Sequence, residues 1–337
     1  MYRVAVVGLG RIGWGASQDP ARLKPASHLE AWRTLSGRAE VVAVCDQEEL
    51  RLQEVGGLPF PHEGSRCYFT DCQRMLEESV PDIVSIATPP ESHRSIVKAC
   101  AAAGVRLVVC EKPLATSSKD AVAMVEACHA SGTILLVNHW RRFEPLLQGA
   151  RALLHERIGT PTRAVAAYCQ GLWTGGTHMA DLLRWFLGEV GWVAAWKTEG
   201  SDESGQEAGA DFILMFRGGT RALVGSLDIR PFVEFGVTIY GERGALEIGS
   251  WGLRTSWWGT DAQYPLASGY RRRVLMSSEV ASPVSPLGRM AEHALAVLDG
   301  TEVPCSTGED GLAAVQILEA AERSAVTHGT PIVPGTA

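Results

Sequence analysis

The segment that most constrains the fold lies at the start of the chain, where an apolar run meets three closely spaced glycines. Residues 3–7, RVAVV, have the pattern of a buried strand, and residues 8–13, GLGRIG, follow directly as G-x-G-x-x-G. Glycine suits this turn because it adopts dihedrals that other residues avoid, and because no Cβ blocks the approach of a pyrophosphate. Helix N–H groups then face the anion. The segment predicts a dinucleotide site lined by Gly8, Gly10, Arg11, Ile12 and Gly13.

The second predicted strand, residues 40–45, ends in Asp46. A carboxylate there accepts hydrogen bonds from both ribose hydroxyls and repels a 2′-phosphate, which favours NAD over NADP. Asp46 follows Gly13 at more than the usual spacing of about 20 residues. Prolines interrupt the interval, so we interpret residues 15–27 as an inserted loop, after which the first helix resumes over residues 27–36. Two placements stay open for this loop, over the cofactor or on the surface.

Strands and helices then alternate in the manner of a doubly wound parallel sheet. The pattern predicts strands at 82–88, 106–110 and 133–137, and helices at 92–103 and from 118 to a stop at Gly132. The turns Thr88-Pro89-Pro90 and Glu111-Lys112-Pro113 follow two of these strands, at the edge where ligands of open α/β sheets bind.

Length and composition restrict the function further. The chain has 337 residues, enough for two domains, and its net charge of −7 without a basic stripe argues against nucleic acid as a partner. No apolar run is long enough to span a membrane, and no signal peptide fits between Met1 and the first strand, so we expect a cytoplasmic protein. The eight cysteines form no C-x-x-C and the histidines show no short metal spacing. We therefore expect free thiols and no metal.

Several motifs together resemble the glucose-fructose oxidoreductase, inositol dehydrogenase and rhizopine-catabolism (Gfo/Idh/MocA) family. The matching segments are GLGRIG at 8–13, Asp46, ATPPESH at 87–93, EKP at 111–113, NHWRRFEP at 138–145 and GTHMADLLRW at 176–185. The resemblance implies that Thr88, Pro89, His93, Glu111 and Lys112 contact the cofactor.

The resemblance also implies an N-terminal Rossmann domain, residues 1–137, and a C-terminal α/β domain, residues 138–337, which binds substrate and forms a homodimer or homotetramer through a large open, mostly antiparallel sheet. Seven predicted strands agree with such a sheet, at 163–169, 193–198, 210–216, 221–229, 234–240, 245–248 and 253–257. Residues 270–286, with three consecutive arginines and two prolines, are predicted to form a loop or lid.

Oxidation of an alcohol by NAD requires a group that takes up the hydroxyl proton. Lys112, at a strand end, is the family's candidate to donate to the substrate oxygen, and the resemblance allows a cis peptide before Pro113. His178 is the candidate base. If Thr174 or Thr177 caps its helix, His178 stands in the first turn, where the positive end of the helix dipole keeps the imidazole neutral. Asp181 then lies on the same face as His178.

One position departs from the family pattern. Many relatives carry an aspartate four residues before the histidine, and this chain has Thr174 there. Asp181 then does part of that work, or the substrate differs from the cyclitols. Further candidates for substrate contact are Trp140 and Arg142. Of Arg141 and Arg142, we expect at least one to be an ordinary surface residue.

These observations predict an NAD-dependent oxidoreductase that transfers a hydride to or from a hydroxyl or keto carbon of a sugar, cyclitol or sugar derivative, including nucleotide-linked sugars. Two alternatives stay open. One is an NAD-using glycosidase of similar fold, which oxidises its substrate transiently and restores the cofactor. The other is a dinucleotide-binding sensor without activity.

Overall fold

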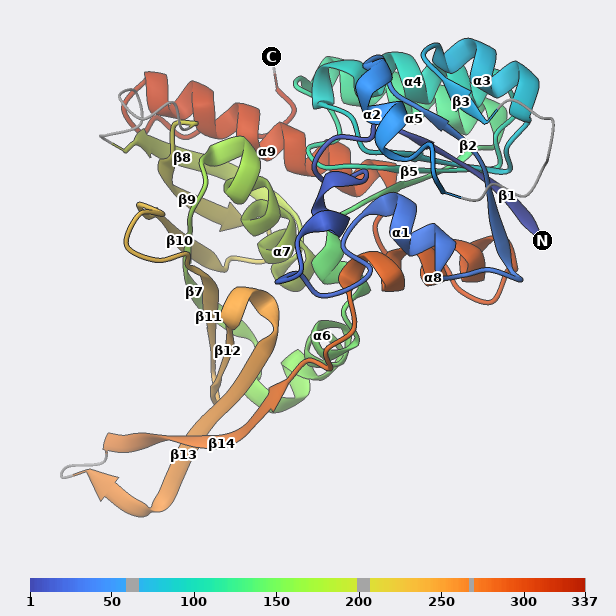
Figure 1. Ribbon diagram of the computed structural model, residues 1–337. Helices are drawn as coiled ribbons and strands as arrows, with labels where there is room; N and C mark the ends of the chain where they lie inside the picture. The colour runs from blue at the N-terminus through green and yellow to red at the C-terminus, as the bar shows by residue number, and fades with distance from the viewer. Residues whose placement is uncertain (59–66, 199–206, 267–269, 337) are drawn as a thin grey trace. The chain divides into compact units, whose positions relative to one another are not determined.

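The computed structural model describes residues 1–58, 67–198, 207–266 and 270–336, and the chain forms two compact units (Figure 1). The first unit comprises Met1–Phe143 and Pro283–Leu312, and the second comprises Glu144–Ser282 and Ala313–Ala337. The sequence predicted one boundary, between residues 137 and 138, and the functions assigned on either side stay predictions. The units differ from that division because residues 283–312 return to the first one.

The first unit is built on a six-stranded parallel sheet of order β3-β2-β1-β4-β5-β6. This order is that of a dinucleotide-binding Rossmann fold, so the predicted fold of this part is confirmed. The strands are β1 (Tyr2–Val7), β2 (Ala39–Cys45), β3 (Tyr68–Phe69), β4 (Ile83–Ile86), β5 (Leu107–Cys110) and β6 (Ile134–Val137).

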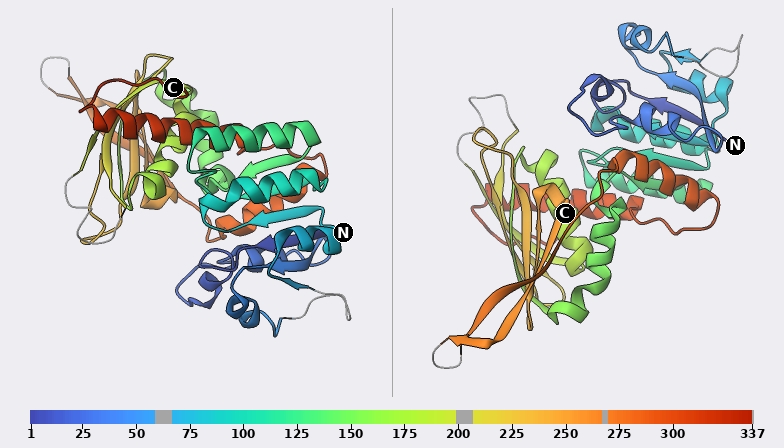
Figure 2. Two further views of the ribbon diagram at one scale, coloured as in Figure 1. Left: turned by 90° about the horizontal axis from the view of Figure 1, so that it is seen from above. Right: turned by 60° about the horizontal axis from the view of Figure 1, so that its bottom comes forward.

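Helices cover both faces of this sheet (Figure 2). They are α1 (His28–Arg33), α2 (Glu49–Glu54), α3 (Cys72–Ser79), α4 (Pro90–Ala102), α5 (Ser118–Ser131) and α8 (Pro286–Leu298), with short 3-10 turns η1 (Gly15–Gln18) and η2 (Trp140–Phe143). Trp32 of α1 and Met290 of α8 are fully buried in one core with Val4 and Val6 of β1. The late helix α8 therefore completes a core that begins with the first strand.

The predicted loop at residues 15–27 interrupts the first helix. The His28 N–H donates to the Ile12 carbonyl at 3.0 Å and the Leu29 N–H donates to the Gly13 carbonyl at 3.1 Å. The first N–H groups of α1 thus bond to carbonyls of the glycine turn, as expected if residues 15–27 are inserted into a single helix. The Ser285 hydroxyl donates to the Pro25 carbonyl, which ties the loop to the start of α8.

The second unit contains an eight-stranded sheet of order β14-β13-β12-β11-β7-β10-β9-β8. Only the β10–β7 pair is parallel, so the expected mostly antiparallel sheet is confirmed. The strands are β7 (Pro161–Tyr168), β8 (Val190–Lys197), β9 (Ala210–Phe216), β10 (Arg221–Ser226), β11 (Phe235–Gly241), β12 (Ala245–Gly249), β13 (Arg254–Leu266) and β14 (Tyr270–Val280), with the 3-10 turn η4 (Ser250–Gly252) before β13.

One face of this sheet packs against helices. Side chains of α6 (Pro145–Ile158), α7 (Thr177–Leu187) and the later part of α9 (Gly308–Val326) share a core with the sheet, and alternate residues of β7 point into it. Buried Ala164, Ala166 and Tyr168 alternate with the half-exposed Val165. This alternation is the period expected of a strand with one covered face.

The loop or lid predicted at residues 270–286 is wrong for residues 270–280 and right for residues 281–285, which form neither helix nor strand. Residues 270–280 form β14, which pairs antiparallel with β13 in a long hairpin. Its residues are exposed on both faces of the strand, so no hydrophobic alternation marks it in the sequence. Within the described residues, no helix has the length and apolar composition needed to cross a membrane.

Candidate functional site

The glycine turn after β1 fits a bound dinucleotide. Gly8 has φ +90°, and a Cβ there would lie 2.8 Å from the Ala87 carbonyl group. A Cβ on Gly13 would lie 1.9 Å from the Gly8 oxygen, so neither position accepts a side chain. At Gly10 the nearest atom to a Cβ would be an Arg51 nitrogen at 3.6 Å, which leaves that glycine open to a ligand. Of the other predicted contacts in this turn, Arg11 is exposed and Ile12 half-buried.

Asp46 lies at the end of β2, directly beside this turn. Its Oδ2 accepts the Leu9 N–H at 2.7 Å and its Oδ1 accepts the Glu48 N–H at 2.9 Å. The Arg51 guanidinium lies 3.5 Å from Asp46 Oδ2 and 2.9 Å from a Glu48 carboxylate oxygen. The predicted ribose carboxylate is therefore fixed against the loop, with a cation next to it.

The preference for NAD over NADP can be tested by replacing Asp46. We expect Asp46→Ser to raise the affinity for NADP relative to NAD by about 10- to 100-fold, because it removes the repelling charge and leaves Arg51 to bind the 2′-phosphate. Dissociation constants of both nucleotides, from fluorescence titration, measure the ratio. Asp71→Ser, at the N-cap of α3, is the matched control. An unchanged ratio in Asp46→Ser would remove Asp46 from cofactor selection.

Glu111, at the end of β5, is the centre of a buried polar network. Its Oε1 accepts hydrogen bonds from His28 Nε2 at 2.8 Å and from Asn138 Nδ2 at 2.5 Å, and its Oε2 accepts the Lys112 N–H at 3.2 Å. The other ring nitrogen of His28 bonds to the Ser85 hydroxyl at 2.8 Å. The backbone that carries Lys112 is thus held from α1, β4 and the end of β6.

Asn138 and the peptide bond after Lys112 have two further features of note at this edge of the sheet. Among the described residues no hydrogen-bond partner reaches the buried Asn138 Oδ1, which leaves an acceptor for a bound group such as the cofactor. The peptide between Lys112 and Pro113 is cis, as the resemblance allowed. Lys112 itself is half-buried.

The environment of Glu111 favours its ionised form. Burial alone would raise the pKa of Glu111, but the hydrogen bonds from His28 and Asn138 and the charge of Lys112 lower it below its ordinary value of 4.5. A carboxyl with a lowered pKa in the folded protein stabilises the fold above the pKa of the unfolded chain, and this contribution disappears as the pH falls through the folded value.

We therefore expect Glu111→Gln to reduce the free energy of unfolding by about 1–3 kcal/mol at neutral pH, because a buried network loses its charged acceptor. The difference from the unsubstituted protein should begin to shrink below pH 4.5, where the carboxyl of the unfolded chain becomes protonated, and should disappear as the pH falls through the lower value of the folded protein. Urea titrations at neutral and acidic pH measure both effects. Glu126→Gln, exposed on α5, is the control. Equal stability of the Glu111→Gln protein at neutral pH would contradict a stabilising role for this charge.

The turn after β4 holds the predicted cofactor contacts Thr88, Pro89 and His93. Thr88 is half-buried and Pro89 exposed, and both precede α4. His93 is fully buried, and its ring nitrogens face the carbonyls of Leu114 at 3.1 Å and Thr88 at 2.9 Å. The His93 ring therefore fixes the backbone of this turn, and a direct contact between His93 and the cofactor stays a prediction.

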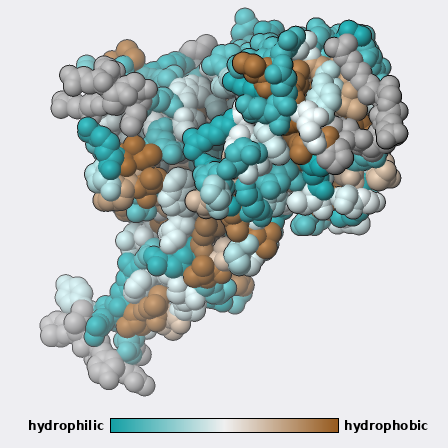
Figure 3. All heavy atoms as spheres, viewed as in Figure 1, coloured by the Kyte–Doolittle hydropathy of each residue, from teal (hydrophilic) through white to brown (hydrophobic). Residues whose placement is uncertain are grey.

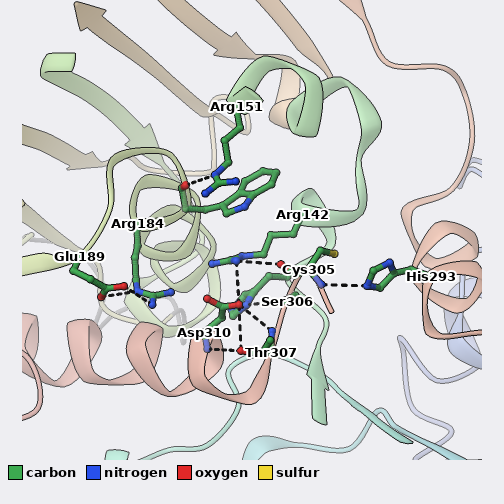
Figure 4. Close-up of polar contacts among 11 residues, drawn as sticks. Arg142, Arg151, Arg184, Glu189, His293, Cys305, Ser306, Thr307 and Asp310 are labelled. Atoms are coloured by element: carbon green, nitrogen blue, oxygen red, sulfur yellow. Dashed lines mark hydrogen bonds and ion pairs between the residues drawn. The ribbon is translucent and has the colours of Figure 1, made fainter. Parts of the chain in front are cut away.

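The segment NHWRRF ends in η2, and both arginines are buried. The expectation of a surface arginine is wrong, because Arg141 and Arg142 are only 3% and 4% exposed. Arg142 Nη1 lies 3.1 Å from Asp310 Oδ2 and donates to the Cys305 carbonyl at 3.1 Å (Figure 4). Arg142 thus joins η2 to the start of α9, while the Arg141 guanidinium lies over the half-buried Trp140 ring, 4.2 Å from its centroid.

Helix α7 of the second unit carries His178 in its first turn, as predicted. The expected threonine cap is wrong, because Gly176 precedes the helix without a side-chain cap and Thr177 is already helical, with φ −59° and ψ −41°. A π-helical turn, η3 (Leu172–Gly176), runs directly into α7 and removes the need for a cap. His178 is half-buried, while Asp181 is only 2% exposed.

The predicted residues thus form two groups. The glycine turn, Asp46, Thr88 and Glu111-Lys112 follow neighbouring strands of the six-stranded sheet, whereas Thr174, His178 and Asp181 lie on one helical segment of the second unit. Sequence reasoning missed the polar residues His28 and Asn138. A histidine and an asparagine at the ends of apolar elements were the only signals for them.

The family model described as "Oxidoreductase family, NAD-binding Rossmann fold" matches residues 2–139. The D-apiose dehydrogenase of Paraburkholderia graminis is 30% identical over 331 residues, which cover 89% of this chain and 84% of that relative. The inositol 2-dehydrogenase 2 of Saccharopolyspora erythraea is 32% identical over 199 residues, 55% of this chain and 54% of that relative.

A solved structure shares the fold over the whole chain. The WlbA dehydrogenase from Bordetella pertussis, in complex with NADH and UDP-GlcNAcA, matches with a TM-score of 0.77 and 24% identity and covers 100% of this chain and 99% of that one. The extended match to a dehydrogenase at 30% identity and the Rossmann match agree with the site geometry above. The chain therefore belongs to the Gfo/Idh/MocA family of oxidoreductases, with an NAD-binding Rossmann fold in its first part.

Proposed function

We propose that this protein is an NAD-dependent dehydrogenase that acts on a hydroxyl or keto carbon of a sugar, cyclitol or sugar derivative. The observation that carries the proposal is the relation to a D-apiose dehydrogenase across 89% of the chain. Relatives named inositol 2-dehydrogenase and 1,5-anhydro-D-fructose reductase support the same class of substrate. The buried network around Glu111 fixes the backbone that carries Lys112, as a site with a precisely placed lysine requires.

The chain's own residues supply the proton chemistry in this proposal. NAD, held by the glycine turn and Asp46, would supply the hydride acceptor. Lys112 donates a hydrogen bond to the substrate oxygen and stabilises the negative charge that develops there. His178 takes the hydroxyl proton as a neutral imidazole. Glu111 and His28 hold the backbone of Lys112, and Arg142 has a structural role in the first unit.

A substrate panel tests the proposal. D-apiose, myo-inositol, other aldoses and nucleotide-linked sugars are mixed with enzyme and NAD, and formation of NADH is followed by absorbance. We expect net NADH formation with at least one of them. Cleavage of a glycoside without net NADH would favour the NAD-using glycosidase, and NAD binding without turnover of any sugar would favour the sensor.

The uncovered face of the eight-stranded sheet supports a homodimer or homotetramer. Val165 and Leu223 lie side by side on β7 and β10 and are 47% and 40% exposed. Apolar side chains also gather over the β13–β14 hairpin, where Leu275 and Met276 are exposed (Figure 3). A second copy would remove this surface from water. Analytical ultracentrifugation should show a dimer or tetramer, and a monomer at micromolar concentration would contradict this.

The cytoplasmic location stays a prediction.

A further inference from the structure

A carboxylate from elsewhere in the chain binds the turn that leads into α7. Glu207, three residues before β9, accepts the Thr174 hydroxyl at 2.6 Å and the Thr174 N–H at 3.1 Å on Oε2, and its Oε1 accepts the Trp173 N–H. These backbone donors lie at the start of a helical segment, where no carbonyl of the preceding turn reaches them. The negative charge is also favourable there because of the helix dipole.

The backbone fixes Glu207 against this turn, although its side chain is exposed. The Leu172 N–H donates to the Ala208 carbonyl at 3.0 Å. A Cβ on Gly171 would lie 2.7 Å from Glu207 Cβ and 2.9 Å from its carbonyl oxygen, so the two segments touch and only glycine fits. The Tyr168 hydroxyl donates to the Ala210 carbonyl at 2.8 Å and so joins the end of β7 to the start of β9.

Thr174, which holds the carboxylate, lies four residues before His178 on the same helical segment. The π-helical turn of η3 passes into α7 without a break, so Thr174 precedes His178 by about one turn, the spacing at which helical side chains are neighbours. The chain lacks an acidic residue at position 174 itself. The threonine hydroxyl instead holds the carboxylate of Glu207 at this place.

On the basis of the function proposed above, we propose that Glu207 is a positioning residue for His178. Through Thr174 it places a negative charge on the first turn of the helical segment and so holds the imidazole ready to take the proton of a substrate hydroxyl. Asp181 is the other carboxylate of this segment, and it is buried on α7 itself. Glu207 therefore supplies the charge from outside the helix, and this role does not require contact with the substrate.

Glu207→Gln removes the charge and keeps part of the capping. The glutamine has one acceptor oxygen, which can accept the N–H of Thr174 or of Trp173 but not both, because its amide nitrogen only donates. We therefore expect a small fall in the thermal midpoint and an unchanged NAD affinity. We expect kcat to fall by about 10- to 100-fold, the range found for residues that hold a reacting side chain in place, with KM changed less than about threefold. Glu242→Gln, which removes a similar exposed carboxylate bonded to the Thr160 N–H at 3.0 Å, is the matched control and should keep full activity.

The double variant Thr174→Asp/Glu207→Gln returns a carboxylate to the turn and should recover kcat to within about threefold of the unsubstituted enzyme, because the charge is restored at the same place. Wild-type kcat in Glu207→Gln would overturn the proposal. So would a loss that appears only in Glu207→Ala together with a lower thermal midpoint, since that is the behaviour of a helix cap.

His178→Asn in the same assay separates failure of the Glu207 proposal from failure of the proposed role of His178. If His178→Asn is inactive while Glu207→Gln is fully active, only the role of Glu207 is wrong. If His178→Asn retains full turnover, the proposed function of His178 fails and the role of Glu207 fails with it.

Discussion

Replacement of Lys112 by alanine is expected to lower kcat by about 10²- to 10⁴-fold, because the variant loses both the donor to the substrate oxygen and the charge that stabilises a developing alkoxide. The fold should survive, since the carboxylate of Glu111 joins α1, β4 and the end of β6 and is retained in the variant. NAD affinity should change by no more than about threefold, as the glycine turn and Asp46 are untouched.

Initial rates and NAD titrations of the purified variant measure both quantities. Lys119→Ala, an exposed lysine at the start of α5, is the control and should behave as the unsubstituted enzyme. Unaltered turnover of Lys112→Ala would remove this residue from the mechanism. Loss of NAD binding in parallel with turnover would instead make Lys112 a cofactor ligand only.

Replacement of His178 by asparagine should also lower kcat by about 10²- to 10⁴-fold, because asparagine keeps a hydrogen-bonding side chain of similar shape and cannot take up a proton. The neighbours of His178 on α7 that fill the core, Met179, Leu182 and Leu183, are unaffected and should preserve stability. His155→Asn, exposed on α6, is the matched control.

The two substitutions combined give a sharper result. If Lys112 and His178 act in the same proton-transfer step, removing both should cost little more than removing the more damaging one, as is found for residues that act as a unit. Measurement of kcat/KM for both single variants and the double variant completes the cycle. Losses that multiply across the cycle would indicate that the two side chains contribute independently.

Much of the first unit could be predicted from sequence because its signals are local. A strand followed by G-x-G-x-x-G, and strands that end in Asp46 and Glu111, each specify a structure within a few residues. The order of the strands and the edge that bears these side chains then follow from the Rossmann topology.

The remaining features depend on contacts between distant parts of the chain. Arg142 can be buried because it pairs with Asp310 and donates to the Cys305 carbonyl. The sequence around residue 142 gives no sign of either partner. Strand β14 has no buried face, so its sequence shows no alternation of apolar and polar residues. It is recognisable as a strand only from its pairing with β13. The carboxylate on the turn before His178 comes from Glu207, 33 residues after Thr174.

If this enzyme moves a hydride from a sugar carbon to NAD, the hydrogen of that carbon must appear in NADH, and an isotope measurement can follow it. The sugar found active in the panel is prepared with deuterium on the carbon to be oxidised, and the products are analysed by mass spectrometry. We expect one equivalent of deuterated NADH for each equivalent of oxidised sugar. Product formed with the cofactor unchanged, or with the label released to water, would contradict it.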